Sequence, residues 1–269
     1  MPRRSRLDAE LVRRGLARSR EQAAQLVAAG MVSIDGQTAA KPATAVAPDT
    51  AVLVRERSHE PAYVSRGGLK LAGALDSLGA AAPLVSGRRC LDAGTSTGGF
   101  TDVLLRRGAT EVVAVDVGYG QLAWSLRTDS RVRVLERTNV RRLTREIVGK
   151  PLPSLVVADL SFISLRLVLP ALLESSAPDA DFLLLVKPQF EVGREGVGAG
   201  GVVRGADLRS SAVMSVIETA AQHGLGTAAV VASELPGPAG NVEYFVHLHA
   251  GAPAPSAELV RRAIESGPQ

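Results

Sequence analysis

From about residue 65 onward, short apolar runs alternate with segments of helical pattern. The expected strands are CLDAG, EVVAVDVG, VRVLER, LVVADLSF, DFLLLVKP, AAVVAS and EYFVHLHA. Helices are expected between them, including one that begins at Gly99 and one from Asp207 to His223. Nearly continuous apolar strands that alternate with helices are typical of a doubly wound α/β sheet. We therefore predict a seven-stranded sheet whose last strand is antiparallel.

The N-terminal part of the chain has a different pattern. Its apolar positions predict a helix over residues 6–14, and a capping-box pattern at Ser19 begins a second helix that ends at Gly30. MVSIDG and TAVLVRER are expected to be extended, and the Asp-Gly pair in the first of them indicates a hairpin turn. The pattern predicts a small α+β domain over residues 1–59.

The two parts also differ in charge. The proline-containing segment SHEPAYV predicts a linker at residues 60–64, before a larger domain over residues 65–269. Residues 1–57 hold 10 Lys and Arg against 6 Asp and Glu, whereas the rest of the chain holds 21 of each. The excess positive charge is therefore N-terminal. From charge alone, contact with phosphates and a solvated helix face are both open interpretations.

Composition excludes several classes of protein. A chain of 269 residues that is 46% hydrophobic can bury a full core. It has no apolar run of membrane-spanning length and no signal-peptide pattern, so we expect a cytoplasmic protein. Cys90 is the single cysteine and is expected to be a core residue, and the four histidines lack metal-ligand spacing. We expect no bound metal.

The N-terminal part resembles a known module. The sequence RLDAELVRRGLARSREQAAQLVAAGMVSIDGQTAAKP is similar to the small RNA-binding domain named after ribosomal small-subunit protein S4. The resemblance implies a basic face that contacts RNA phosphates through Arg4, Arg6, Arg18, Arg20 and Lys41. Contacts of this kind position RNA without reading its sequence.

A glycine-rich turn indicates where a small molecule binds. LDAGTSTGGF joins a strand end to a helix, and Ser96 stands where a dinucleotide fold needs the glycine that admits a pyrophosphate. This argues against NAD. Asp116 ends the next strand, 22 residues after Gly94, where a carboxylate could accept both ribose hydroxyls.

This turn resembles that of class I S-adenosylmethionine (SAM) methyltransferases, which have a Rossmann-like seven-stranded sheet. The resemblance implies SAM as cofactor, with its methionine part near Asp92, Gly94, Ser96, Gly98 and Gly99, its ribose on Asp116 and its adenine near Thr138 and Asn139. Asn139 could equally cap a loop. Phe162 could stack on a base or on adenine, with packing as the alternative.

Four charged residues are expected at one edge of the sheet. Asp159 and Lys187 end strands, Glu243 begins the antiparallel strand, and Lys70 falls in the first turn of the helix GGLKLAGALDSLG. Ligands of open α/β sheets bind beyond the carboxyl ends of the strands. The order Lys70, Asp159, Lys187, Glu243 resembles the catalytic tetrad of FtsJ-like ribose 2′-O-methyltransferases.

With the N-terminal module, the whole chain is similar to the TlyA family of ribosomal RNA 2′-O-methyltransferases. SRGGLKLAGAL, VADLSFISL, VKPQFEVG and GPAGNVEYF carry this match. The family implies methylation of cytidine ribose in ribosomal RNA and an effect on sensitivity to capreomycin and viomycin. The extension MPRRSR favours 16S and 23S substrates. We expect ribosomal RNA as partner, no membrane and a monomer.

The expected chemistry is attack of a ribose 2′-oxygen on a sulfonium methyl group, which needs a general base. Lys187 is the candidate base, Lys70 and Glu243 would orient the hydroxyl, and Asp159 would help to align the methyl group. The protonation state of Lys187 is left open. Only four of the 31 basic residues are lysines, and two of these four are tetrad members. Lysine can release its proton, whereas arginine cannot.

Two other functions compete with the enzyme. One is a non-catalytic RNA-binding or ribosome assembly factor, against which the complete tetrad argues. The other is a membrane-lytic haemolysin, a name given to relatives. Neither a spanning segment nor a strongly amphipathic lytic helix supports that alternative.

Overall fold

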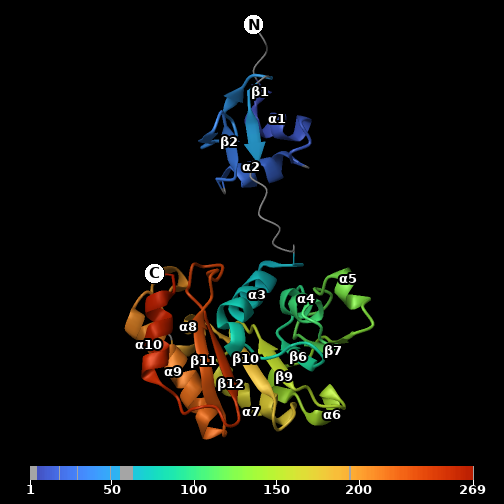
Figure 1. The fold of residues 1–269 in the computed structure, drawn as a ribbon, viewed down its shortest axis with the longest axis vertical. Helices are drawn as coiled ribbons and strands as arrows, with labels where there is room; N and C mark the ends of the chain where they lie inside the picture. The colour runs from blue at the N-terminus through green and yellow to red at the C-terminus, as the bar shows by residue number, and fades with distance from the viewer. Residues whose placement is uncertain are drawn as a thin grey trace. The chain divides into compact units, whose positions relative to one another are not determined.

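The structure is a computed structural model that describes residues 5–17, 19–28, 30–48, 50–54, 63–193 and 195–268. The described residues form two compact units, one that ends at Val54 and one that begins at Tyr63 (Figure 1). The predicted boundary near residue 60 and most of the predicted linker lie outside the described residues, so both stay predictions.

The first unit packs two helices on short strands. Helices α1 (Leu7–Arg13) and α2 (Arg20–Ala28) enclose a small core with the strands, in which Leu7 and Leu11 are fully buried. The hydroxyl of Ser19 accepts a hydrogen bond from the Gln22 amide at 3.1 Å, as the capping pattern predicts. The strands are β1 (Ser5–Arg6) with β4 (Ala45–Val46), and β2 (Val32–Ile34) between β3 (Gln37–Thr38) and β5 (Val52–Val54).

The second unit contains the predicted seven-stranded sheet. Its order is β11-β12-β10-β9-β6-β7-β8, and β12 is antiparallel to both of its neighbours while the other pairings are parallel. The predicted sheet and its antiparallel last strand are therefore confirmed. The bounds are β6 (Arg89–Ala93), β7 (Glu111–Val115), β8 (Val132–Leu135), β9 (Leu155–Ala158), β10 (Asp181–Val186), β11 (Gly226–Ala232) and β12 (Tyr244–His249).

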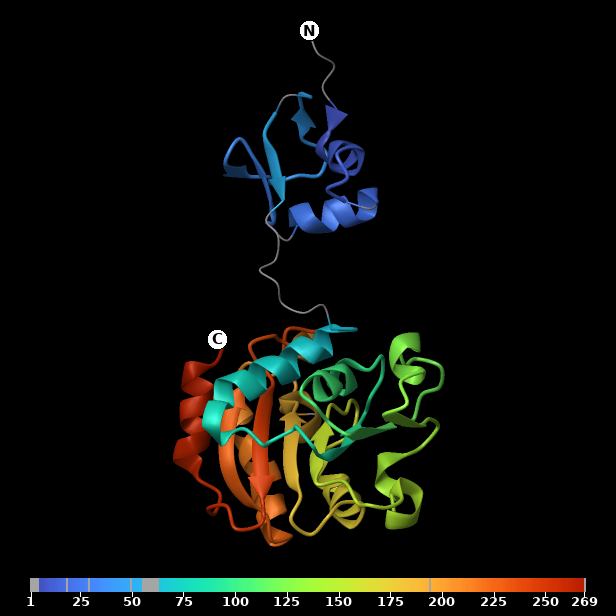
Figure 2. The ribbon, with the colours of Figure 1, turned by 45° about the vertical axis from the view of Figure 1, so that its right-hand side comes forward.

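Helices cover both faces of this sheet. On one face lie α3 (Arg66–Leu78), α4 (Gly99–Arg106) and α5 (Trp124–Arg127), and α3 crosses in front of the strands in Figure 2. On the other face lie α6 (Arg145–Val148), α7 (Leu169–Glu174), α9 (Ala206–Gln222) and α10 (Ala257–Ser266). Short 3₁₀ turns complete the chain at Gly79–Ala81, Val140–Arg142, Leu165–Leu167 and Ala199–Gly201.

Strand β10 shows why its sequence is continuously apolar. Leu183 and Leu185 pack with α3 and α4, whereas Phe182, Leu184 and Val186 pack with the helices of the opposite face. The strand ends at Val186, and Lys187 caps the one-turn helix α8 (Pro188–Glu191), which has proline in its first position.

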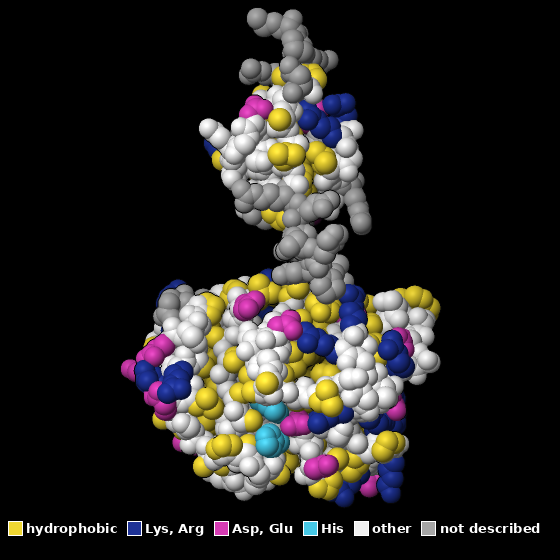
Figure 3. All heavy atoms as spheres, in the orientation of Figure 1, with side chains coloured by type: hydrophobic (Ala, Val, Ile, Leu, Met, Phe, Trp, Pro, Cys, Tyr) yellow, Lys and Arg dark blue, Asp and Glu magenta, His cyan; other side chains and the backbone are white. Residues whose placement is uncertain are grey.

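The surface of the second unit mixes both signs of charge. Basic and acidic side chains are interspersed on the face drawn in Figure 3, in agreement with the equal numbers of the two kinds beyond residue 57. No helix in the described part of the chain is long and apolar enough to cross a membrane.

Candidate functional site

Two adjoining cavities open at the carboxyl ends of the central strands, where β6 and β9 lie side by side and the strand order reverses. We call the first the lysine cavity. It measures about 300 Å³ and is lined by residues that include Arg66, Lys70, Ser161 and Lys187. The second, the Asp116 cavity, measures about 460 Å³. The two share Gly94, Ser96, Asp159 and Ser161.

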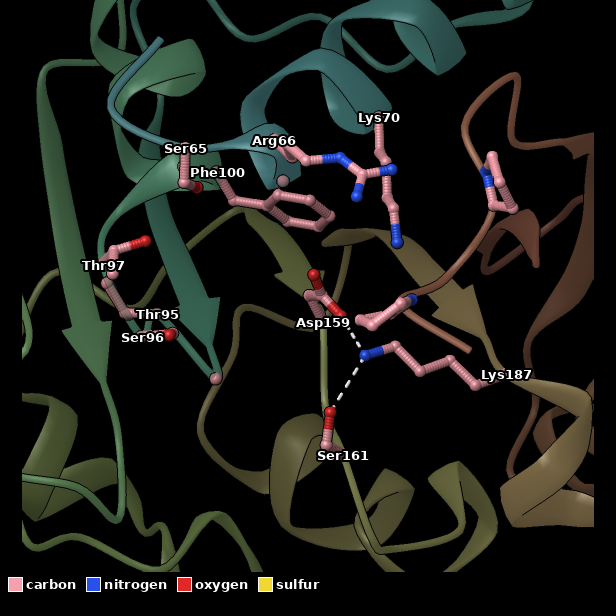
Figure 4. A pocket seen from close by; sticks show the side chains of 15 residues that line it. Ser65, Arg66, Lys70, Thr95, Ser96, Thr97, Phe100, Asp159, Ser161 and Lys187 are labelled. Atoms are coloured by element: carbon pink, nitrogen blue, oxygen red, sulfur yellow. Dashed lines mark hydrogen bonds and ion pairs between the residues drawn. The ribbon is translucent and has the colours of Figure 1, made fainter. Parts of the chain in front are cut away.

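Lys187 enters the lysine cavity from the end of β10. Its Nζ lies 2.5 Å from Oδ1 of Asp159, which directly follows β9, and donates a hydrogen bond to the hydroxyl of Ser161 at 3.1 Å (Figure 4). The contact with Asp159 is a close ion pair without the geometry of a hydrogen bond. No donor in the described residues forms a hydrogen bond with that oxygen. Lys187 is only 8% exposed, so these neighbours restrict its amine to one region of the cavity.

Lys70 reaches the same cavity from α3 and is held by a different carboxylate. Its Nζ lies 2.5 Å from Oε2 of Glu243, the residue that directly precedes β12. Glu243 is fully buried and lies behind the cavity wall, and its second oxygen has no hydrogen-bond partner in the described residues. A Cβ at Gly237 would lie 2.4 Å from that oxygen, so a side chain there would press on the Glu243 carboxylate.

The four predicted tetrad residues therefore meet as two ion pairs, Lys70 with Glu243 and Lys187 with Asp159. Helix α3 begins at Arg66, so Lys70 falls in its second turn rather than in the predicted first turn. Removing either partner of a buried pair would leave an uncompensated charge, which costs several kcal/mol, about 3 to 5. The arrangement keeps both amines in the cavity.

The glycine-rich turn lies close to Asp159. Gly94 has a φ of 88°, and a Cβ there would lie 2.5 Å from the carbonyl oxygen of Asp159. Ser96 also has a left-handed φ, 49°, which is uncommon for a residue other than glycine. Gly94, Ser96 and Gly99 line the lysine cavity. The chain backbone thus forms part of the cavity wall.

Asp92 and Gly98, both predicted cofactor contacts, line neither cavity. A Cβ at Gly98 would collide with Leu122 and Leu126, so this glycine makes room for packing. Asp92 is fully buried and accepts a hydrogen bond from the hydroxyl of Thr101 at 2.6 Å. Burial, with a smaller effect of the nearby carboxylates of Asp159 and Asp116, raises the pKa of Asp92 to about 7, although the hydrogen bond from Thr101 acts in the opposite direction.

Asp116 stands at the junction of β7 with its loop and lines the Asp116 cavity. One carboxylate oxygen accepts a hydrogen bond from the Gly118 amide and the other from the Ser96 amide, both at 2.7 Å. Each oxygen of a carboxylate has two acceptor sites. Asp116 can therefore accept two further hydroxyl groups while its backbone contacts hold it in place.

Thr138, Asn139 and Phe162 line the far part of the Asp116 cavity. The hydroxyl of Thr138 donates to the Glu136 carbonyl at 3.0 Å, and the Asn139 side chain caps the turn Val140–Arg142, the alternative role considered above. Phe162 is 91% exposed, has a left-handed φ of 65° and contacts Phe190 at 5.4 Å between ring centroids. Backbone strain at an exposed aromatic marks a candidate contact residue.

Sequence reasoning missed Arg66 and Ser161. Arg66 is exposed and lines the lysine cavity beside Lys70 (Figure 4), and its side chain makes no hydrogen bond or ion pair with a described residue. The sequence spacing could have indicated Arg66, because it lies four residues before Lys70 and therefore on the same face of the helix. Ser161 follows Asp159 by two residues in the loop beyond β9.

In the first unit, two of the predicted RNA contacts hold a buried carboxylate. Arg6 and Arg20 contact Asp8 at 2.9 and 3.1 Å, and their side chains stay 53% and 60% exposed. Lys41 is also exposed, whereas Arg4 and Arg18 lie outside the described residues. Across the described ranges of both units, no group of three or more His, Cys, Asp or Glu is placed to hold a metal ion.

Comparison with known proteins identifies both units. Residues 63–250 match the FtsJ-like methyltransferase family, and residues 5–52 match the S4 domain. A protein of Mycobacterium tuberculosis named "16S/23S rRNA (cytidine-2′-O)-methyltransferase TlyA" is 60% identical, with 100% of each chain covered. The chain belongs to the TlyA family of FtsJ-like methyltransferases.

Other members of this family carry a different name. A Brachyspira hyodysenteriae protein named "Hemolysin A" is 35% identical over 90% of this chain and 98% of its own. A solved structure of a hemolysin-named protein from Streptococcus thermophilus is 36% identical, with a TM-score of 0.75 over 98% of this chain and 96% of that one. The TlyA family therefore includes members named for either activity.

Proposed function

We propose that this protein transfers a methyl group from SAM to the ribose 2′-hydroxyl of cytidines in 16S and 23S ribosomal RNA. The observation that carries the proposal is the convergence of Lys70, Asp159 and Lys187 in one cavity, next to a second cavity that holds Asp116. The name of the 60% identical relative supports the substrate. We also propose that the protein acts as a cytoplasmic monomer, and the family resemblance predicts an effect on capreomycin and viomycin sensitivity.

The residues present fit SAM. Gly94 lines both cavities, so a ligand there can lie against the backbone of the turn, and Asp116 has acceptor sites for two ribose hydroxyls. The Asp116 cavity has the size of a small-molecule site and offers Thr138, Asn139 and Phe162 to the adenine. When bound, SAM supplies a methyl group on a sulfonium. Asp92 and Gly98 would act from behind the cavity wall, by shaping the turn.

The roles of the chain's own residues follow from their contacts. Lys187, in its neutral form, would accept the proton of the 2′-hydroxyl, and Asp159 and Ser161 hold its amine in place. Lys70, fixed by Glu243, would orient the same hydroxyl. Arg6, Arg20 and Lys41 would hold RNA phosphates from the first unit, together with Arg4 and Arg18, which lie outside the described residues.

The test is transfer of labelled methyl from SAM to separated ribosomal subunits, followed by mapping of the modified ribose. We expect cytidine 2′-O-methylation in both subunits. Lys187→Ala should lower the rate by roughly 10²- to 10⁴-fold, the usual contribution of a general base, while SAM affinity stays within about threefold. Lys150→Ala is the matched control, since Lys150 is exposed and lines neither cavity, and it should leave transfer unchanged.

Failure of the wild-type protein to methylate either subunit would overturn the proposed function. In that case, binding of ribosomal RNA without transfer would favour the assembly-factor alternative. Methylation on a base instead of a ribose would overturn the reaction type and leave SAM use intact.

A further inference from the structure

The loop that follows β9 carries much of the site but little regular structure. We call residues 159–166 the β9 loop. It includes Asp159 and Ser161, which line both cavities, and Phe162, which lines the Asp116 cavity. Between the end of β9 at Ala158 and the 3₁₀ turn at Leu165, no helix or strand holds it. Some other contact must fix its position.

A buried carboxylate holds the far end of this loop. Oε2 of Glu191 accepts a hydrogen bond from the Ser164 hydroxyl at 2.5 Å, and Oε1 accepts one from the Leu165 amide at 2.7 Å. Arg166 adds two contacts, from Nε to Oε2 at 3.3 Å and from Nη2 to the backbone carbonyl of Glu191 at 3.2 Å. The Glu191 side chain is only 1% exposed. Three consecutive loop residues are therefore tied to one side chain.

Glu191 lies on the same helical turn as the proposed base. Helix α8 runs from Pro188 to Glu191, and Lys187 is its N-cap. Lys187 contacts Asp159 and Ser161 at the near end of the β9 loop, while Glu191 holds the far end. Between these two attachments, the rings of Phe162 and Phe190 make the contact described above. One short turn thus carries both attachments of the loop.

The chemistry of the contacts requires a carboxylate. The Leu165 amide and the Arg166 guanidinium can only donate hydrogen bonds, and the Ser164 hydroxyl donates here. An amide in place of Glu191 would turn an NH₂ group towards one of these donors and leave buried polar groups unpaired. Burial also raises the pKa of Glu191, which shows that keeping the charged carboxylate here costs free energy of folding. Packing alone does not explain why a charged residue occupies this position.

We infer that Glu191 is a positioning residue for methyl transfer, which holds the β9 loop so that Asp159 and Ser161 fix the amine of Lys187. The inference rests on the proposed function. Glu191 lines neither cavity, so it acts on the site through the β9 loop and not by direct contact with a ligand. Its removal should loosen the site while the sheet and both cores stay intact.

The test compares Glu191→Gln with Glu218→Gln, a matched change at an exposed glutamate of α9. Glu191→Gln should lower kcat about 10- to 100-fold, since a displacement near 1 Å can cost that much, with the KM for RNA within about threefold. Amide exchange in residues 159–168 should become faster, above all at Leu165. Glu191→Asp keeps both acceptor oxygens and should restore part of kcat, and Glu218→Gln should match the wild-type protein.

Three results would overturn the inference. One is a folded Glu191→Gln protein with wild-type kcat, and another is unchanged exchange at Leu165. A kcat loss explained entirely by the unfolded fraction, recovered on cooling, would also overturn it by reducing Glu191 to a stabilising role. If the wild-type protein transfers no methyl group, the proposed function fails by itself, and the exchange experiment still decides whether Glu191 anchors the loop.

Discussion

Each unit buries a carboxylate, and the surroundings of the two shift their pKa values in opposite directions. Asp8 in the first unit is 5% exposed and contacts two guanidinium groups, and its hydrogen bond with Arg6 holds its pKa well below the usual range. Asp92 in the second unit is fully buried, and it accepts its hydrogen bonds from Thr101, a residue without charge. Burial therefore raises its pKa, as described above.

The difference separates two uses of charge. In the first unit, an acid arranges arginines whose guanidinium groups stay exposed, which gives a fixed positive surface suited to phosphates. In the second unit, the acids Asp159 and Glu243 hold lysine amines inside a cavity. Arginine keeps its proton at any ordinary pH, whereas an amine can give it up. The first arrangement suits binding and the second suits proton transfer.

The largest expected effect comes from replacing lysine by arginine in the lysine cavity, which tests whether the two units use their charges differently. Lys187→Arg keeps the positive charge but removes the group that can release a proton, so we expect transfer to fall by roughly 10²- to 10⁴-fold. The reciprocal change in the first unit, Arg20→Lys, should alter affinity for ribosomal RNA by less than about threefold. Single-turnover rates and a binding titration measure the two effects. Transfer by Lys187→Arg within tenfold of wild type would remove Lys187 as the base.

The second expected effect is on stability against pH. The pKa of Asp92 is raised in the folded protein, so its protonated carboxyl group adds to the free energy of unfolding at low pH. This added stability is fully present below about pH 4 and is lost as the pH rises through about 7. The loss amounts to at most about 4 kcal/mol. Asp92→Asn should remove this component. Urea unfolding at pH 5 and pH 8 measures it, with Asp179→Asn at an exposed site as control. Equal pH dependence in wild type and Asp92→Asn would contradict the assignment.

The smallest expected effect concerns Asp8. Asp8→Asn removes the charge that orients Arg6 and Arg20, so the first unit should lose about 1 to 2 kcal/mol and bind ribosomal RNA a few-fold more weakly. No cation is removed, so the salt dependence of binding should stay the same. Glu21→Gln makes the same charge change at an exposed residue without a described partner. Tighter binding by Asp8→Asn would show that Asp8 merely repels RNA.

The sequence predicted the parts of the site that depend on periodicity. Strand ends follow from apolar runs and their terminators, and parallel strands end at one edge, so Asp159 and Lys187 were expected to meet. The seven strands, the antiparallel strand β12 and the capped helices of the first unit followed from the same local rules. The S4 domain and the methyltransferase family were also predicted from the sequence.

Other features depend on which side chains meet in space. Nothing in the sequence indicates that Lys70 pairs with Glu243 and Lys187 with Asp159, because all four lie at one edge. The direction in which Asp92 points, towards Thr101 and away from both cavities, is equally non-local. Phe162 has a left-handed φ although it is not a glycine, so the sequence does not indicate this conformation. Such details are decided by long-range packing.

The close approach of Gly94 to the carbonyl of Asp159 has a mechanical consequence. The glycine-rich turn and the β9 loop approach each other here backbone to backbone, with no space for a side chain between them. A substitution at Gly94 is therefore felt at Asp159, and a shift of Asp159 is felt at Gly94. A displacement of either loop therefore requires the other to move with it, so the two cavity walls behave as one mechanical unit.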